Sequence, residues 1–363
     1  MYYLIYITEK CNLFCKYCDS GGRRILHGRD ISDSLDDVVA FLARDDNVRI
    51  KLYGGEPMLA PELIHQLLRR VKPKSAVLQT NGTLLEAITP ELFDLIDAVS
   101  VSFDGPAEIT DLKRGRGVFD HVMEQTRGLL ERGYPGRLDA RMTISPGVEI
   151  ERAVGYFFDG CELPFERIHW QLNACFNASQ WSFRSADIRD WFEHSYNPQI
   201  SALIARWVDE LVSHDRYLQL VPFACLVHDL ITGDRRETVR CGSGEEMWTI
   251  TPAGEIYPCP IMREYPEDSV GNVRTITPGQ LAPSHALGEP CTSCDLLGMC
   301  GGRCLCANLY REWGTQGQAV VCGSVRHLVG QLEEVAPIIE TLIATDRLTL
   351  DQLLIGEDYE EIP

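Results

Sequence analysis

The sequence predicts an α/β protein in which six strand–helix units build a parallel sheet. Short apolar runs of strand length alternate with segments of helical spacing as far as His214, a pattern that implies parallel pairing and right-handed crossovers. Unusual loop residues also follow the strands rather than precede them. An open doubly wound sheet and a partial barrel both fit six such units. Hydrophobic residues are 45% and charged residues 24%, as in ordinary globular proteins.

The elements follow from local pattern, in chain order. The expected strands are Tyr2–Ile7, Val48–Tyr53, Ala76–Gln79, Ala98–Phe103, Leu138–Ile144 and Arg167–Leu172. In the first expected helix, apolar residues recur at helical spacing on one face. Proline favours the first turn of a helix, so two helices are expected to begin at prolines. The expected helices are Ser34–Arg44, those starting at Pro61 and Pro90, Val118–Arg132, Glu149–Phe158, and Asp187–His214 with an interruption near Pro198.

Four loops contain the candidate functional residues. CNLFCKYC follows the first expected strand, GGEP the second, TNG the third and DGP the fourth. In parallel α/β proteins the active site is built from loops at the carboxyl ends of the strands. We therefore expect these loops to meet on one face.

Charge and hydropathy exclude several classes of partner. The chain has 34 Lys and Arg against 53 Asp and Glu, a net charge of −19, so nucleic acid and anionic membranes are poor partners. No apolar run approaches the roughly 20 residues that span a bilayer. The start, MYYLIYITEKC, lacks the features of a signal peptide. We expect a cytoplasmic protein that binds a small molecule, or a neutral or basic peptide.

Of the fourteen cysteines, three lie at the start of the chain and eight between residues 241 and 322. Cys11, Cys15 and Cys18 have the spacing C-x3-C-x2-C, which three thiolates can use to hold one metal centre. A [4Fe–4S] cluster held by three cysteines leaves one iron open, whereas a structural zinc would need a fourth, distant ligand. Cys161, Cys175 and Cys225 are interpreted as small buried apolar residues. Cys175, which follows the sixth strand, is also a candidate hydrogen donor in the cavity.

CNLFCKYC, with Tyr17 before its last cysteine, resembles the signature of the radical S-adenosylmethionine (SAM) superfamily. The resemblance implies a partial (β/α)6 barrel. It also implies that the first cysteine triple holds a [4Fe–4S] cluster whose open iron chelates SAM. One electron, from a donor such as ferredoxin or flavodoxin, then yields a 5′-deoxyadenosyl radical that abstracts hydrogen. The resemblance further implies SAM contacts by Tyr17, Gly54, Gly55, Glu56, Pro57, Asn81, Ser102 and Arg114.

The later cysteines resemble the SPASM extension of this superfamily, which holds two auxiliary [4Fe–4S] clusters. The resemblance assigns Cys241, Cys259 and Cys304 to the first auxiliary cluster. It assigns Cys291, Cys294, Cys300 and Cys322 to the second. A pair of zinc ribbons is the alternative. Three possibilities remain for the fourth ligand of the first auxiliary cluster. It could be Cys306 or Cys225, or the position could be an open site.

This resemblance predicts four consecutive regions and a reaction class. The regions are a partial barrel over 1–186, a helical bridge over 187–240, a SPASM domain over 241–325 and a C-terminal helical tail over 326–363. Enzymes of this type mostly modify peptides, by thioether or other crosslinks or by epimerisation. A separate leader-binding protein is a further expected partner.

Three other interpretations remain. One is a sulfatase-maturase-like oxidase that forms formylglycine, which is weakened because Pro260 stands where such relatives carry an aspartate. Another is a radical SAM enzyme that modifies a small molecule. The third is a non-catalytic iron–sulfur electron carrier or zinc-binding module, which would not need an open iron beside GGEP.

Overall fold

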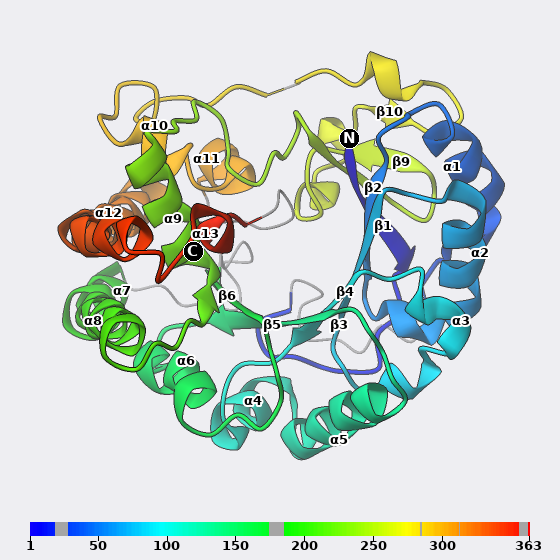
Figure 1. Cartoon of the computed structure of the whole chain (residues 1–363). Helices are drawn as coiled ribbons and strands as arrows, with labels where there is room; N and C mark the ends of the chain where they lie inside the picture. The colour runs from blue at the N-terminus through cyan, green and yellow to red at the C-terminus, as the bar shows by residue number, and fades with distance from the viewer. Residues whose placement is uncertain (19–27, 174–184, 284, 312, 356–361) are drawn as a thin grey trace. The chain divides into compact units, whose positions relative to one another are not determined.

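The computed structural model describes residues 1–18, 28–173, 185–283, 285–311, 313–355 and 362–363 of the 363-residue chain (Figure 1). Its packing separates two compact units. The first comprises Met1–Phe103, Thr110–Ala140 and Gly242–Ala286; the second comprises Asp104–Ile109, Arg141–Cys241 and Leu287–Pro363. Both units are discontinuous in sequence, unlike the four consecutive regions that the sequence predicts.

The first unit is built on a mixed sheet. Five of its strands run in parallel, in the order β8-β1-β2-β3-β4. Strands β9 and β10 continue the sheet beyond β8 in antiparallel pairing. The strands are β1 (Tyr2–Thr8), β2 (Arg49–Gly54), β3 (Ser75–Thr80), β4 (Ala98–Ser102), β8 (Met247–Ile250), β9 (Glu255–Tyr257) and β10 (Gly271–Asn272). The predicted α/β class with a parallel sheet is confirmed.

Strand β1 lies at the centre of this sheet. All seven of its residues are buried, as expected for a parallel strand covered on both faces. Tyr2 pairs with Arg49 of β2 on one side and with Met247 of β8 on the other. Strand β8 comes from the region that the sequence assigns to a separate cysteine-rich domain. That region therefore extends the sheet on which the first cysteine loop stands.

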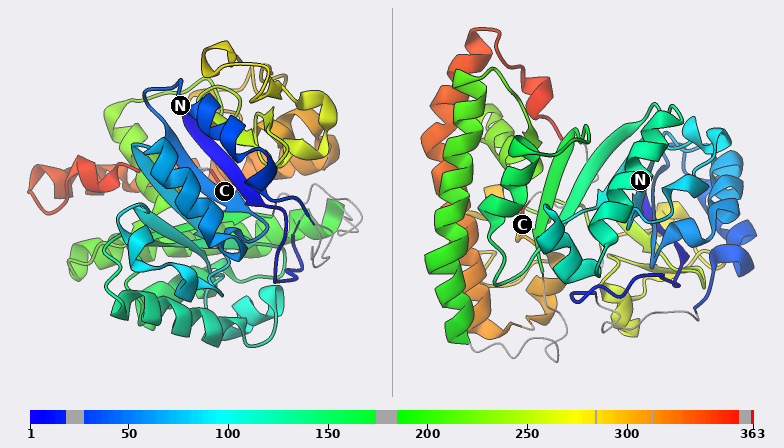
Figure 2. Two further views of the ribbon diagram at one scale, coloured as in Figure 1. Left: turned by 90° about the vertical axis from the view of Figure 1, so that its right-hand side faces the viewer. Right: turned by 90° about the horizontal axis from the view of Figure 1, so that it is seen from below.

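Helices of the first unit cover the sheet on its outer side (Figures 1 and 2). Helix α2 shows why they form: Pro61 opens it, and Ile64, Leu67 and Leu68 point into the core. Lys72 then adopts a left-handed conformation and ends the helix. The helical segments are η1 (Ile31–Asp33), α1 (Leu35–Leu42), η2 (Pro57–Leu59), α2 (Pro61–Val71), η3 (Leu85–Ala87), α3 (Pro90–Phe93), α5 (Val118–Glu131), η5 (Met262–Glu264), η6 (Pro266–Asp268) and η7 (Pro278–Gln280).

The second unit carries the later helices. Two elements, α4 (Ala107–Arg114) and β5 (Arg137–Ile144), run across the division between the units, and β6 (Arg167–Leu172) pairs in parallel with β7 (Gln219–Leu220). Trp170 of β6 packs edge-to-face on Phe223, with ring centroids 5.2 Å apart. The helices are α6 (Ile150–Asp159), α7 (Ser185–Trp191), η4 (Phe192–Tyr196), α8 (Asn197–Ser213), α9 (Val221–Thr232), α10 (Leu297–Cys300), α11 (Leu305–Tyr310), α12 (Gly314–Ala344) and α13 (Leu350–Leu353).

The predicted helix Asp187–His214 is continuous, but one of its turns has a different hydrogen-bond pattern. Residues Phe192–Tyr196 form a π-helical turn between α7 and α8. Pro198 is one of the first residues of α8. Because proline has no N–H and its ring clashes with the preceding turn, a wider turn just before it lets the chain continue.

Helix α12 packs against α8 and α9 within the second unit (Figure 2). It runs continuously from Gly314 to Ala344, so the predicted boundary between residues 325 and 326 falls inside it. Cys322 therefore stands on a long helix rather than in a compact cysteine-rich loop.

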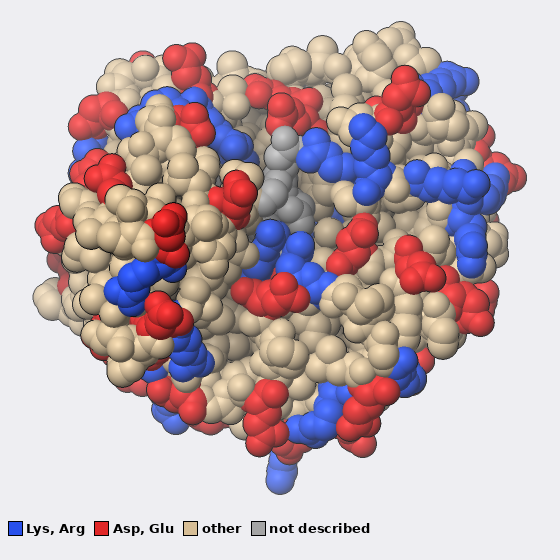
Figure 3. Space-filling view, in the orientation of Figure 1, with Lys and Arg blue, Asp and Glu red and all other residues tan. Residues whose placement is uncertain are grey.

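Two surface properties bear on the predicted partners. Among the described residues, no helix combines the length and the apolar character that crossing a bilayer requires. On the face shown in Figure 3, acidic and basic side chains are interspersed.

Candidate active site

The loop that follows β1 carries the first cysteine triple. Cys18 N–H donates to the carbonyl of Cys15 at 3.1 Å, which closes a turn between these two residues. The backbone N–H of Lys16 donates to the carbonyl of Lys113 at 2.9 Å and so fixes the loop to the end of α4. Cys11 and Cys15 are partly buried, whereas Cys18 is exposed. Three thiols within eight residues thus stand at the carboxyl end of the central strand.

The electrostatics of Cys11 fit a metal ligand. Burial raises the pKa of its thiol, and the nearby Glu56 and Cys18 raise it further, while Asn81 lowers it. The first and last thiols of the motif are thus within electrostatic range of each other. A bound cation relieves this repulsion by stabilising the thiolates, and metal binding then releases protons. The site therefore suits a positively charged metal centre.

Glu56, in the GGEP loop, joins the loops that follow β2 and β3. Its side chain is fully buried. Oε1 accepts hydrogen bonds from Thr80 Oγ1 at 2.7 Å and Met58 N at 3.0 Å, and Oε2 accepts one from Asn81 N at 2.7 Å. Burial raises the pKa of Glu56 to about 7, although these three donors favour the ionised form. Glu56 thus positions both loops.

The two glycines of GGEP allow the backbone to lie against the cysteine loop. Gly55 N donates to Thr8 O at 2.9 Å, and Glu56 N donates to Lys10 O at 2.8 Å. A Cβ on Gly55 would lie 2.3 Å from the carbonyl oxygen of Lys10. Such contacts involve backbone that cannot turn aside, so the close approach requires glycine. The GGEP loop therefore fixes the backbone immediately before Cys11.

Asn81, in the loop after β3, holds the cysteine loop from a second direction. Its Nδ2 donates to Asn12 Oδ1 at 2.8 Å and lies 4.0 Å from Cys11 Sγ. Its Oδ1 accepts from Thr83 Oγ1 at 2.7 Å, and Asn12 Nδ2 donates back to Thr83 Oγ1 at 2.8 Å. This closed network fixes the orientation of both amides. Its contact with SAM stays a prediction.

Two of the predicted SAM-contacting residues, Tyr17 and Arg114, lie next to each other. The guanidinium of Arg114 lies 5.3 Å from the centre of the Tyr17 ring, and the Lys113 ammonium lies 5.5 Å from it. Both cations are buried. Ser102 ends β4 beside β3. These positions place positive charge near the cysteine loop, and the SAM contacts of Tyr17, Gly54, Gly55, Pro57, Ser102 and Arg114 stay predictions.

In the second unit, four cysteine thiols lie within electrostatic range of others of the set. Burial raises the pKa of the Cys300 thiol to about 11, and the nearby thiols of Cys322 and Cys291 add to the shift. Burial likewise raises the pKa of Cys322, followed by effects of Cys291 and Cys294. Cys322, on α12, is thus within electrostatic range of Cys291, Cys294 and Cys300. This donor set fits a four-thiolate metal centre.

The ligands predicted for the other auxiliary cluster are divided between the units. Cys241 and Cys304 belong to the second unit and Cys259 to the first, so this triple stays a prediction. Of the two alternative fourth ligands, Cys306 is completely buried in α11. Cys225 lies in α9, where its thiol donates to the carbonyl of Pro222 at 3.8 Å. The fourth ligand stays open.

Two cysteines outside these sets have different positions. Cys161 is partly buried, and its thiol lies 3.6 Å from the carbonyl oxygen of Leu163. Cys175, the predicted hydrogen donor, lies outside the described residues.

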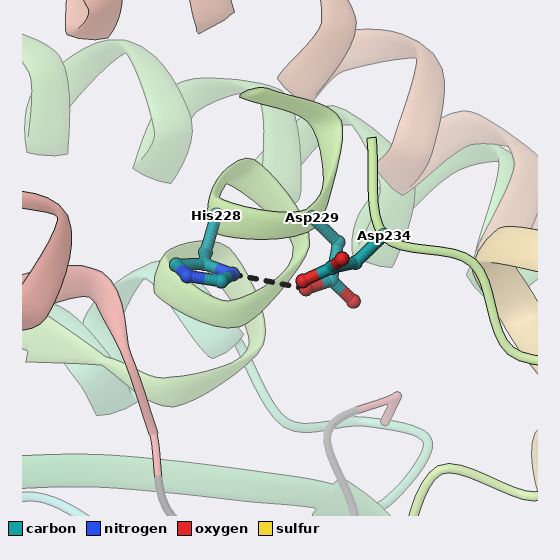
Figure 4. A group of neighbouring side chains, drawn as sticks. All are labelled: His228, Asp229 and Asp234. Carbon is teal, nitrogen blue, oxygen red and sulfur yellow. Dashed lines mark hydrogen bonds and ion pairs between the residues drawn. The ribbon is translucent and has the colours of Figure 1, made fainter. Parts of the chain in front are cut away.

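His228, Asp229 and Asp234 form a further group of metal-binding residue types (Figure 4). His228 Nδ1 lies 3.1 Å from Asp229 Oδ1. The other carboxylate oxygen of Asp229 forms a buried ion pair with Arg240, which is 1% exposed. A metal ion bound here would lie beside that guanidinium and would be repelled by it. We therefore interpret this group as a structural ion pair.

Sequence reasoning missed several residues that build the site. Asn12 lies within the CNLFCKYC motif, and Thr80 begins the TNG motif, but neither was assigned a role. Both act through side-chain hydrogen bonds to residues far away in the chain. Their position inside the two motifs was the available signal. The partners, Thr83 and Glu56, become apparent only when the strands pair.

Comparison with known proteins identifies relatives of this chain. The model of the radical SAM superfamily matches residues 5–155. The probable GTP 3′,8-cyclase of Methanococcus maripaludis is 39% identical over 102 residues, which are 27% of this chain and 34% of the cyclase. The chain thus spans about a third of the length of that relative. The mycofactocin maturase MftC of Mycobacterium ulcerans is 24% identical over 342 residues, or 87% of this chain and 86% of MftC.

A solved structure shows the same fold. The structure of native anSMEcpe with bound AdoMet and Cp18Cys peptide matches with a TM-score of 0.73 at 18% identity, covering 93% of this chain and 99% of that one. Residues 5–155 of the chain therefore match the radical SAM superfamily as a radical SAM domain.

Proposed function

We propose that this chain is a radical SAM enzyme that installs a modification on a peptide or protein. The observation that carries the proposal is the fixation of the Cys11–Cys18 loop. The GGEP backbone holds it from one side, and Asn81 holds it from another. Both supports stand at the carboxyl ends of parallel strands, where α/β proteins place their chemistry.

Cys11, Cys15 and Cys18 would hold a [4Fe–4S] cluster. When bound, this cluster and SAM supply the 5′-deoxyadenosyl radical that removes a hydrogen atom from the substrate. The chain itself provides position and charge. Glu56 fixes the GGEP backbone against the cysteine loop, and Arg114 offers a buried positive charge next to Tyr17. Such a charge suits the carboxylate of a bound SAM.

A peptide substrate is supported by two of the relatives. MftC is named as a maturase, and the anSMEcpe structure contains a bound peptide. The net charge of −19 favours a neutral or basic peptide over an acidic one. We propose a thioether or other crosslink, or an epimerisation, as the outcome. Formylglycine formation is less well supported because Pro260 follows Cys259.

The four-thiol set of Cys291, Cys294, Cys300 and Cys322 would hold an auxiliary [4Fe–4S] cluster. The effects of Cys291, Cys294 and Cys322 on the pKa values of neighbouring thiols support one shared centre. We assign Cys241, Cys259 and Cys304 to a second auxiliary cluster on the resemblance to SPASM proteins. A low-potential donor such as ferredoxin or flavodoxin, a separate leader-binding protein and a cytoplasmic location complete the proposal.

Short peptides encoded beside the gene are the natural probes of this function. Each would be incubated without oxygen with the reconstituted enzyme, SAM and dithionite, in ordinary and in heavy water. We expect one peptide to change mass. Loss of two hydrogens indicates a crosslink, whereas gain of one deuterium without other change indicates epimerisation. Exchange of a cysteine thiol for a carbonyl oxygen indicates formylglycine.

Two controls make the result specific. Reactions without SAM, and reactions with the Cys15→Ala variant, should leave every peptide unchanged. The peptide proposal is contradicted if the enzyme converts SAM to 5′-deoxyadenosine but leaves all of these peptides unmodified. Conversion of a metabolite under those conditions would support the small-molecule alternative instead.

A further inference from the structure

Asn308 forms a buried side-chain hydrogen bond to a cysteine of the four-thiol set. It lies in α11 and is 4% exposed. Its Nδ2 donates to Cys291 Sγ at 2.9 Å, and its Oδ1 accepts from the backbone N–H of Gly288 at 3.2 Å. The amide therefore lies between the thiol and the backbone just before it.

These two contacts determine which way the amide faces. A backbone N–H can only donate, so the atom opposite Gly288 N must be the carbonyl oxygen of the side chain. The NH2 group must then face the sulfur. Cys291 N–H also donates to Gly288 O at 3.0 Å. The side-chain amide of Asn308 and the thiol of Cys291 are thus both held by the turn that begins at Gly288.

The backbone of Asn308 is held just as firmly. Its N–H donates to the carbonyl of Cys304 at 2.9 Å, and its carbonyl accepts from Arg311 Nε at 3.2 Å. The side chain has little freedom to turn away from Cys291. A second donor, Arg326 Nη2, lies 3.8 Å from Cys294 Sγ, but Arg326 is exposed and paired with Asp295. Water competes with that contact and does not reach the one made by Asn308.

An N–H donor to a cluster-bound sulfur has a defined effect on redox chemistry. Hydrogen bonds to the sulfurs are one of the factors that set the potential of an iron–sulfur cluster. The reduced cluster carries one more negative charge than the oxidised one. The N–H dipole therefore stabilises the reduced form more, and the potential rises. Burial strengthens this effect because the local dielectric constant is low.

We propose that Asn308 is a positioning residue that raises the reduction potential of the auxiliary cluster held by Cys291, Cys294, Cys300 and Cys322. The inference rests on the proposed function, since it requires an iron–sulfur cluster at these thiols. By favouring the reduced form, Asn308 makes this cluster a better acceptor for an electron released when the substrate is oxidised than the cluster would be without this hydrogen bond.

The test is a redox titration of the full-length enzyme followed by electron paramagnetic resonance. Asn308→Leu removes the donor at similar size, and Asn308→Asp keeps the acceptor toward Gly288 but removes the donor. We expect both variants to keep about twelve iron atoms per chain, on four per cluster. One of the cluster signals should shift to a more negative midpoint potential, by more in Asn308→Asp, while the others stay unchanged.

Thr292→Val is the matched control, because Thr292 is exposed beside Cys291 and its hydroxyl donates to Glu289. Its potentials should equal those of the wild type. Unchanged potentials in both Asn308 variants with full iron content would overturn the inference. Loss of about four irons in both would also overturn it, because Asn308 would then be structural. Zinc in place of iron in the wild type would instead refute the proposed auxiliary cluster.

Discussion

Replacing Cys11, Cys15 and Cys18 together by alanine removes about four of roughly twelve iron atoms per chain and stops the cleavage of SAM. The three thiols are the predicted ligands of one cluster, and they stand on a loop that GGEP and Asn81 hold in place. The loss should be confined to this cluster because the four-thiol set lies in the other unit. Iron analysis measures the loss of the cluster. The spectrum of the reduced protein with and without SAM measures whether SAM still binds to it.

Cys161→Ala is the matched control for this experiment. Cys161 belongs to neither cysteine set, and its thiol interacts with the Leu163 carbonyl and the Tyr156 side chain. That variant should retain all iron and the spectral change on adding SAM. If the triple variant also retained both, the first cluster would have other ligands, and the assignment of the motif would be wrong.

Replacing Asp229 by alanine should destabilise the protein by about 3–5 kcal/mol, the cost of leaving one partner of a buried ion pair uncompensated. Arg240 is 1% exposed and would keep its charge without the carboxylate. Its other nitrogen donates to Met299 O at 3.0 Å, next to Cys300. The free energy of unfolding in urea, measured without oxygen, checks this prediction.

The same group offers its own control. Asp234 is exposed, and its replacement by alanine should change the free energy of unfolding by less than about 0.5 kcal/mol. Equal losses for Asp229→Ala and Asp234→Ala that appear only with an added divalent cation would contradict the ion-pair interpretation. They would indicate a metal site at these residues instead.

The loops of the site could be predicted because each is marked by a short sequence motif directly after a recognisable strand. A parallel sheet brings the carboxyl ends of neighbouring strands together, so Cys11, Gly55 and Asn81 were expected on one face from strand positions alone. The hydrophobic pattern that defines those strands is strong: β1 is buried along its whole length. For the same reason, helix α2 begins at Pro61 as predicted.

Other features depend on contacts that no local pattern reveals. Strand β8 has only four residues, and it pairs with β1 across more than two hundred residues of sequence. Helix α9 is buried on nearly all sides, so its apolar residues show no helical periodicity. The bond from Asn308 to Cys291 joins two segments whose approach is set by tertiary packing.

The formation of 5′-deoxyadenosine tests the central claim most directly, namely that the Cys11–Cys18 loop holds a cluster with an open position for SAM. The enzyme would be reconstituted without oxygen, mixed with SAM and dithionite, and sampled over time by chromatography. We predict that 5′-deoxyadenosine accumulates with the wild type. Its absence from samples that hold about twelve iron atoms per chain would contradict the account.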